Sequence, residues 1–327
     1  MATRIVGVLN LTPDSFSDGG RFSSVADGVA AGLAMVEQGA DWLDVGGEST
    51  RPGSVPVPEA EEIARVAPVI RELSARLAGR VRLSVDTYKA GTARAALAEG
   101  ATAVNDVSGG LLDPEILGVA ASGRAVMVVG HLRGTPADML GNVHFDNVIE
   151  EVANELGGRV AAARAAGCGE VWADPGIGFG KHLAHNLCLL KHLARVRARL
   201  GVPIMVGVSR KRFIGELLTW EPSEGSQTLR PPTCPTSPLA PLGLARWSAA
   251  GEGAREGARG GQSGLSVPKA GGLPTRLRPA LERLFGTAAA VAVAIMNGAD
   301  AVRVHDVAAM RDVARVVEAI AQAEQSD

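Results

Sequence analysis

The sequence predicts an α/β protein folded as a single (β/α)8 TIM barrel, and three observations lead to that fold class. Short β-branched segments alternate with Ala-, Leu-, Glu- and Arg-rich segments of helical period along the chain. The strand segments are continuously apolar, as in a parallel sheet that is covered on both faces. Eight such strand–helix units follow one another, which is the order of a closed barrel. A doubly wound sheet can also hold eight strands and is the alternative at this step.

The strand and helix candidates alternate in strict order. Strands are expected at 4–10, 42–47, 81–87, 103–109, 125–131, 170–176, 203–209 and 300–307. Helices are expected at 25–38, 59–78, 90–99, 114–122, 147–166, 186–200, 281–297 and 307–323.

One segment interrupts this alternation. Residues 221–280 contain half of the 18 prolines and show neither helical nor strand period. Such a composition buries too little apolar surface to offset the entropy of ordering. We therefore expect one barrel domain over residues 1–327, with a flexible Pro-, Gly- and Arg-rich insertion at 221–280, in the loop after the seventh strand.

A polar residue lies at or within a few residues of the carboxyl end of every predicted strand. In a (β/α)8 barrel the carboxyl ends of the strands meet at one mouth, which holds the active site. Helix capping is an alternative role for residues of these types and explains some of the positions. The residues concerned are Asn10, Asp44, Asp86, Asn105, His131, Asp174, Ser209 and His305.

Composition narrows the function classes. The formal net charge of -2 gives no basic surplus for general nucleic-acid binding, and aromatic residues make up only 3% of the 327 residues. No apolar stretch of membrane-spanning length and no signal peptide is visible, so we expect a cytoplasmic protein that acts on small molecules without nucleic-acid or membrane partners.

Four motifs and a terminal fifth resemble dihydropteroate synthase, in the family's order and at similar spacing. They are LNLTPDSFSDGG (9–20), GGESTRPG (46–53), DPGIGFGK (174–181), SRKRFIGEL (209–217) and RVHDV (303–307). The resemblance implies a pterin-binding TIM barrel that makes folate precursors and is a target of sulfonamides. The implied transferase condenses 6-hydroxymethyl-7,8-dihydropterin diphosphate with 4-aminobenzoate and releases pyrophosphate by a dissociative path.

The resemblance also assigns roles to individual residues. The implied catalytic group is Asp86, Lys211, Arg303 and His305. The implied pterin site combines Asp86, Asn105, Asp174 and Lys211 with the apolar neighbours Phe179, Val8 and Met205. Unpaired donors and acceptors of a buried pterin ring would cost about 1–3 kcal/mol each, which explains the need for carboxylates and amides.

The other substrate groups need cations and hydrogen-bond donors. Arg303 and His305 lie two apart on one strand, so both side chains point to the same face. By resemblance Asn10 helps to bind Mg²⁺, with Asp44 a further candidate. The implied diphosphate and aminobenzoate residues are Asn10, Phe16, Thr50, Arg51, Pro52, Ser209, Arg303 and His305.

Two other functions share part of this pattern. A pterin-binding methyltransferase would share the carboxylate and amide set but would not need STRPG or the Arg303–His305 pair. A non-catalytic pterin-binding paralogue would not need every site residue. For His131 both a structural and a binding role stay open, because Gly130 precedes it where the family usually has Met. The family resemblance also implies a homodimer, and the loop after Asn10 suits a lid over the mouth.

Overall fold

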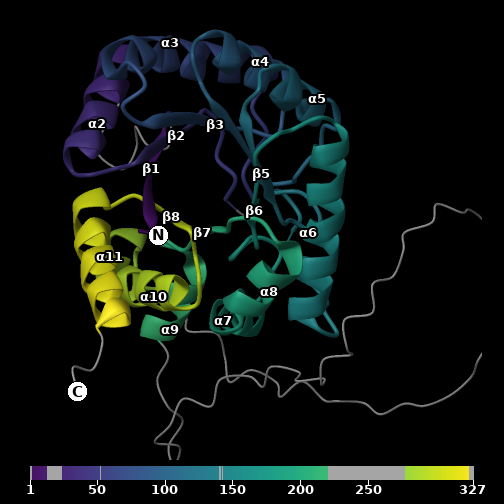
Figure 1. Ribbon diagram of the computed structural model, residues 1–327, viewed down its shortest axis with the longest axis vertical. Helices are drawn as coiled ribbons and strands as arrows, with labels where there is room; N and C mark the ends of the chain where they lie inside the picture. The colour runs from purple at the N-terminus through teal and green to yellow at the C-terminus, as the bar shows by residue number, and fades with distance from the viewer. Residues whose placement is uncertain are drawn as a thin grey trace, which may run out of the picture.

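Eight parallel strands surrounded by helices form the barrel shown in Figure 1, a computed structural model. The structure describes residues 2–12, 24–51, 53–139, 141, 143–219 and 277–323. The predicted (β/α)8 class is confirmed. Phe16 and Pro52, the lid segment beyond Thr12 and nearly all of the 221–280 insertion lie outside the described residues, so those predictions stay predictions.

The strands follow the predicted order: the first has the predicted bounds, and the other seven are shorter by up to three residues at either end. They are β1 (Arg4–Asn10), β2 (Trp42–Gly46), β3 (Arg82–Asp86), β4 (Ala103–Asp106), β5 (Val126–Gly130), β6 (Val171–Asp174), β7 (Met205–Gly207) and β8 (Ala301–Val304).

The helices alternate with these strands on the outside of the barrel. They are α2 (Val25–Glu37), α3 (Glu59–Leu77), α4 (Ala90–Ala98), α5 (Glu115–Ser122), α6 (Val148–Ala165), α7 (Leu183–Lys191), α8 (Leu193–Leu200), α9 (Arg212–Leu218), η1 (Ala280–Arg283), α10 (Leu284–Met296) and α11 (Val307–Gln322).

Strand pairing closes the sheet almost completely. The hydrogen-bonded order runs β6-β5-β4-β3-β2-β1-β8-β7. An isolated parallel bridge between Ala173 and Ile204 joins β6 to the start of β7, and the Ala173 amide donates to the Pro203 carbonyl at 3.0 Å. The alternative of an open doubly wound sheet is therefore wrong.

Two predicted helical regions differ from the expectation. The helix predicted at 186–200 begins at Leu183 and is divided at His192 into α7 and α8. The short helix α9 was not predicted, because its seven residues span too few turns to establish a period. It lies between β7 and the insertion, so the insertion separates α9 from α10 rather than following the strand directly.

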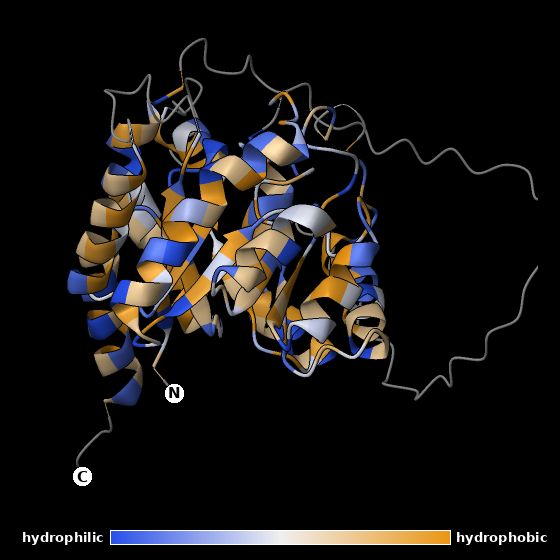
Figure 2. Cartoon of the chain, turned by 90° about the horizontal axis from the view of Figure 1, so that it is seen from above, coloured by the Kyte–Doolittle hydropathy of each residue, from blue (hydrophilic) through white to orange (hydrophobic). Residues whose placement is uncertain are grey.

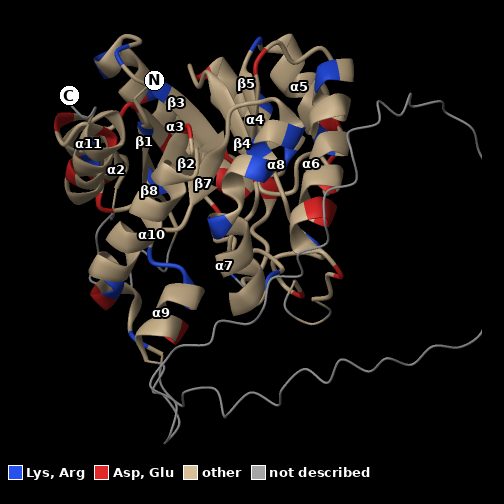
Figure 3. Cartoon of the chain, turned by 60° about the horizontal axis from the view of Figure 1, so that its bottom comes forward, with Lys and Arg blue, Asp and Glu red and all other residues tan. Residues whose placement is uncertain are grey.

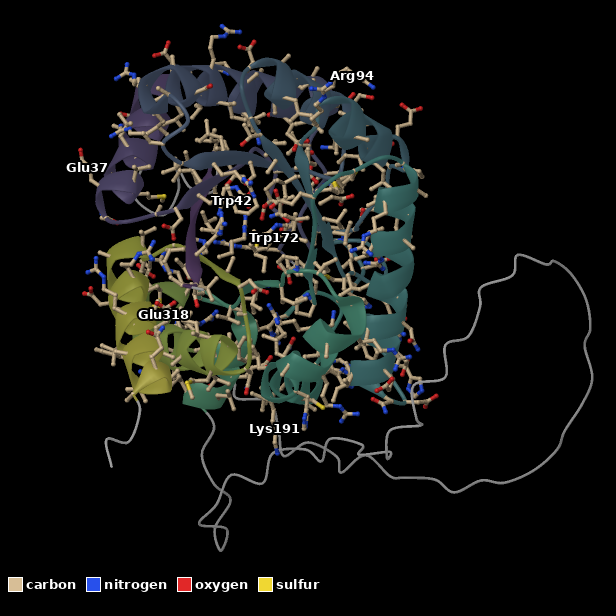
Figure 4. All side chains as sticks on the ribbon, in the orientation of Figure 1. Glu37, Trp42, Arg94, Trp172, Lys191 and Glu318 are labelled. Atoms are coloured by element: carbon tan, nitrogen blue, oxygen red, sulfur yellow. The ribbon has the colours of Figure 1, made fainter. Side chains whose placement is uncertain are left out.

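An apolar layer fills the barrel interior below the mouth. Side chains alternate between the two faces of a strand, so every second residue points inward. Trp42 and Trp172 meet edge to face in this layer, with ring centroids 5.8 Å apart, and both lie near the centre of the barrel in Figure 4. The rest of the layer is Val6, Ala103, Val126, Val128, Met205 and Ala301.

Hydropathy and charge follow the barrel plan. Apolar residues concentrate on the strands and the inner sides of the helices (Figure 2), whereas acidic and basic residues are interspersed on the outer helices (Figure 3). Among the described helices, none is long and apolar enough to cross a membrane.

Candidate active site

A cavity opens at the carboxyl ends of the strands. It encloses about 380 Å³, including space open to solvent. Most of its polar lining comes from the residues that the motifs singled out. The lining consists of Thr50, Asp86, Asn105, Val107, Gly130, His131, Asp174, Gly176, Phe179, Gly207, Lys211 and Arg303.

The alternation of side chains along each strand explains why these residues converge on the cavity. Asp86 and Asp174 are the last residues of β3 and β6, and Asn105 is the second-last residue of β4. Each occupies an inward position two residues beyond a small or apolar inward residue. The barrel therefore has a polar layer directly above its apolar one.

Asp44 organises this polar layer, although it does not line the cavity. It was expected near a strand end, but it lies in the middle of β2, and its side chain is 1% exposed. Its carboxylate accepts hydrogen bonds from Ser84 Oγ, from Asn105 Nδ2 at 2.9 Å and from Arg303 Nε at 2.5 Å. Because a carboxylate only accepts, Asn105 turns its Nδ2 toward Asp44, which leaves Oδ1 as the amide atom able to accept from a ligand.

Arg303 joins two carboxylates beneath the mouth. Its Nη2 donates to Asp86 Oδ2 at 2.6 Å while its Nε donates to Asp44. Burial raises the pKa of Asp86 to about 7, against the opposing attraction of Arg303. Burial alone would lower the pKa of Arg303, but Asp86 and Asp44 raise it above its ordinary value, so the guanidinium stays charged.

Lys211 follows β7, the strand that pairs with β8, and lies beside Asp174 and Phe179. Its ammonium donates to the carbonyl of Ile177 and sits 4.1 Å from the centroid of the Phe179 ring. Burial lowers the pKa of Lys211 to about 8, with Asp174 opposing the shift. Burial also raises the pKa of Asp174, with Lys211 opposing. The cavity thus carries two carboxyl groups, Asp86 and Asp174, whose pKa values are raised by burial. It also carries two basic groups, of which Lys211 has a lowered pKa and Arg303 a raised one.

His131 is occupied by protein partners on both ring nitrogens. Nε2 lies 3.0 Å from Glu155 Oε2, and Nδ1 lies 2.8 Å from Lys181 Nζ. Burial, together with Lys181, lowers the pKa of His131 to about 3, so the ring is neutral. Because the Glu155 carboxylate only accepts, the ring proton lies on Nε2, and Nδ1 accepts from Lys181 Nζ. These contacts favour the structural role that the sequence left open.

Lys181 was not singled out by the sequence analysis, although it ends the DPGIGFGK motif. It is 3% exposed, and its Nζ also contacts the carbonyls of Phe179 at 3.0 Å and His131 at 3.4 Å. Gly176 in the same loop has φ +66°, and an added Cβ would lie 1.9 Å from the His131 carbonyl oxygen. Glycine is therefore required where this loop passes β5.

Ser209 and His305 form a second polar pair near the mouth. Ser209 Oγ accepts from the His305 amide at 3.2 Å and lies 3.0 Å from His305 Nδ1. The hydroxyl can donate to Nδ1 while it accepts from the amide, which leaves the ring proton on Nε2. Burial, with Arg210 and Arg303, lowers the pKa of His305 to about 3. His305 is therefore a neutral donor rather than a cation.

Four other predicted residues lie around or below this set. Arg51 is exposed on the β2–α3 loop, next to the cavity-lining Thr50. Met205 does not line the cavity but lies one inward position before Gly207, in the apolar layer with Trp42. Val8 is likewise buried one inward position below Asn10. Neither Met205 nor Val8 lines the cavity, and their predicted pterin contacts stay predictions.

Asn10 ends β1 and faces inward beside Gly46 and Asp86. An added Cβ on Gly46 would lie 3.5 Å from both Asn10 Oδ1 and the Asp86 Cβ. Among the described residues, no three His, Cys, Asp or Glu side chains gather as a metal cage. Mg²⁺ commonly takes few protein ligands and several phosphate oxygens and waters, so one amide oxygen at the mouth fits a metal carried largely by a diphosphate.

Comparison with known proteins agrees with this geometry. Residues 6–231 match the pterin binding enzyme family. The dihydropteroate synthase of Synechocystis is 36% identical over 97% of this chain and 90% of its own length. That of Xanthomonas albilineans, solved with 4-aminobenzoic acid, superposes with a TM-score of 0.74 at 38% identity, covering 99% and 94% of the two chains. The Yersinia pestis enzyme, solved with a sulfonamide drug complex, gives 0.77 at 31% identity, covering 98% and 95%.

The barrel, the polar residues at its mouth and the family match together define the class of the protein. The chain belongs to the pterin binding enzyme family. Within that family its relatives of comparable length are dihydropteroate synthases, and the chain is a member of that group.

Proposed function

We propose that the chain catalyses the condensation of 6-hydroxymethyl-7,8-dihydropterin diphosphate with 4-aminobenzoate to 7,8-dihydropteroate and pyrophosphate, a transferase step of folate biosynthesis. The observation that carries this proposal is the polar layer of Asp86, Asn105, Asp174, Lys211 and Arg303 at the mouth of a dihydropteroate synthase barrel.

The pterin ring is expected to bind the deepest part of this layer. Its amino and ring N–H groups match the carboxylate oxygens of Asp86 and Asp174 and the amide oxygen of Asn105. Its carbonyl matches the ammonium of Lys211, which is held over Phe179. Because these groups are already fixed by protein contacts, little reorganisation is needed when the ring binds.

The reaction breaks the bond between the pterin methylene carbon and the diphosphate oxygen, and the electron pair leaves with pyrophosphate. The amino nitrogen of 4-aminobenzoate then bonds to the methylene carbon and loses one proton. The protein contributes orientation and electrostatic stabilisation rather than a covalent intermediate. The buried carboxylate of Asp86 is suited to stabilise positive charge that develops on the pterin.

The diphosphate is proposed to lie among Arg51, Arg303 and the Nε2–H of His305, with Asn10 at the same rim. The side chain of Asn10 would hold Mg²⁺ there, and the ion would neutralise charge on the leaving group when bound. The aminobenzoate is proposed to contact Ser209 and Thr50, with Phe16 and Pro52 contributing from outside the described residues.

Pyrophosphate release tests the proposed function directly. Purified protein with Mg²⁺ and both substrates is expected to release one pyrophosphate for each dihydropteroate formed. Asp86→Asn is expected to lower kcat/KM by about 100-fold or more, as for loss of a group that stabilises developing charge. Glu72→Gln, on the exposed face of α3, is the matched control. Absence of release from the wild-type protein across Mg²⁺ and Mn²⁺ concentrations contradicts the proposal.

We also propose that the protein is cytoplasmic, as the sequence predicts, and that it forms a homodimer, as the family resemblance implies. Exposed apolar side chains on α10 and α11 support a self-contact there, because apolar patches of this kind commonly mark interfaces. Met296 is 59% exposed, and Val316 and Ile320 are 59% and 65% exposed. Sedimentation velocity should show a dimer that Ile320→Ser with Met296→Ser converts to a monomer; a wild-type monomer overturns the assignment.

A further inference from the structure

A buried charged cluster lies beside the candidate site and has no part in the chemistry proposed above. Glu48 follows β2, and Tyr88 and Lys89 follow β3. Glu62 joins them from the first turns of α3. The side chains of Glu48, Glu62 and Lys89 are 5%, 1% and 14% exposed. Charged groups buried to this extent need partners, and they identify contacts that the fold depends on.

Glu48 uses both of its carboxylate oxygens. Oε1 accepts the hydroxyl proton of Tyr88 at 2.8 Å, and Oε2 accepts from the Val57 amide at 3.0 Å and from Lys89 Nζ at 2.5 Å. The Tyr88 contact reaches the β3–α4 loop. The Val57 contact reaches the far end of the β2–α3 loop, in which Glu48 itself lies. One carboxylate therefore closes the β2–α3 loop and joins it to its neighbour.

Lys89 completes the closure from the other side. Its Nζ donates to the Val57 carbonyl and to Glu62 Oε2, both at 2.7 Å. Burial alone would lower the pKa of Lys89, but the hydrogen bonds with Glu48 and Glu62 raise it above its ordinary value. Lys89 is therefore a charged donor at all working pH values, and its three donors match these three oxygen acceptors.

The loop held in this way carries Thr50 and Arg51. Thr50 lines the cavity, and Arg51 is the exposed guanidinium proposed for the diphosphate. A further contact, from the Gly53 amide to the Pro136 carbonyl at 2.9 Å, ties the loop to the β5–α6 loop. The pterin-binding carboxylates, by contrast, are fixed by the strands that bear them.

We propose that Glu48, Tyr88 and Lys89 are positioning residues for the aminobenzoate side of the mouth. They hold the β2–α3 loop in the conformation that places Thr50 and Arg51, without touching substrate themselves. The inference rests on the proposed function, in which Thr50 contacts the aminobenzoate. It assigns a role to the glutamate of GGESTRPG that the motif alone did not provide.

Two mild substitutions test this role. Tyr88→Phe removes one hydroxyl, and Glu48→Gln keeps the size of the side chain but removes the charge. Because Y88F removes one hydrogen bond to Glu48 and E48Q removes the charge that binds Lys89 and Val57, we expect KM for 4-aminobenzoate to rise about threefold in Y88F and about tenfold in E48Q. The affinity for 6-hydroxymethyl-7,8-dihydropterin, which lacks the diphosphate, should change by less than about twofold by calorimetry.

Amide hydrogen exchange gives a readout that is independent of activity. Exchange at residues 53–57 should accelerate in E48Q, because the Val57 amide loses its charged acceptor, and should be unchanged in the α3 surface control Glu72→Gln. If E48Q does not fold, Y88F decides through its KM values.

Each outcome bears on the proposal. A selective rise in the aminobenzoate KM with faster exchange supports it. Equal changes for both ligands, or faster exchange with unchanged KM values, overturn it, because the cluster would then be merely structural. If the wild-type protein releases no pyrophosphate, the proposed function fails, and the positioning role fails with it even where exchange shows that Glu48 anchors the loop.

Discussion

Arg303 and Asp86 form an ion pair beneath the mouth of the barrel, with Nη2 2.6 Å from Oδ2. The same guanidinium also binds Asp44, so the arginine proposed for the diphosphate is held by the carboxylates of the pterin layer. The two halves of the substrate would therefore be recognised by one connected network. Substitutions in this network are expected to affect both binding and the departure of pyrophosphate.

The free energy of unfolding of the protein should depend on pH through the ionisation of Asp86. Burial raises the pKa of Asp86 from 3.8 to about 7. Between about pH 4 and pH 7 the folded protein holds a proton that the unfolded chain has released, so stability falls as pH rises through this interval. The free energy of unfolding of the wild type minus that of Asp86→Asn should decrease from pH 4 to pH 7 and then level off. Urea denaturation measures it, and a difference that increases with pH contradicts the raised pKa.

Activity should be confined to a narrow pH interval. Ionised Asp86 and protonated Lys211 coexist mainly between their pKa values of about 7 and about 8. The profile of kcat/KM for the pterin diphosphate should therefore be bell-shaped, with its maximum between these values. Lys211→Arg should abolish the basic limb, because guanidinium keeps its charge. A basic limb that survives in K211R at the same pH would assign it to another group.

Lys181 should stabilise the β6–α7 loop, which carries Phe179. Its Nζ contacts His131 Nδ1 and the Phe179 and His131 carbonyls within 3.4 Å, and burial lowers the pKa of this amine well below its ordinary value. Lys181→Met leaves these acceptors without their donor, which costs about 2–4 kcal/mol. The melting temperature should fall by about 5–10 °C, and pterin affinity should fall with it, because Lys211 packs on Phe179.

Lys191→Met is the matched control for this substitution. Lys191 points away from the barrel on the outer end of α7 (Figure 4). It should change neither the melting temperature nor pterin affinity. Normal pterin binding by a folded K181M protein would show that the loop does not need this anchor.

The fold was predictable because apolar strands and helical segments repeat in strict alternation, and the inward parity of Asp86, Asn105 and Asp174 follows from strand geometry. The roles of Asp44 and Lys181 were not predictable from local pattern, because they arise from contacts such as Asp44–Arg303 between residues distant in sequence. The neutral state of His305 was also hidden, since it depends on burial and on Arg210 and Arg303. The motifs GGESTRPG and DPGIGFGK contain Glu48 and Lys181, but their sequences do not indicate which residues these side chains contact.

Residues 221–276 should be dispensable for catalysis. The described segments on either side of them already pack together: an added Cβ on Gly286 of α10 would lie 2.4 Å from Ile214 Cγ2 of α9, and Arg283 Nη1 donates to the Arg210 carbonyl at 2.8 Å. Because α9 and α10 meet directly, a short Gly/Ser linker in place of 221–276 should leave both helices in place, and long insertions add little loop-closure free energy. We expect kcat/KM within about threefold of the full chain, or about 0.7 kcal/mol in transition-state free energy. Pyrophosphate release and circular dichroism check this expectation, and a folded but inactive deletion protein would show that the insertion contributes to the site.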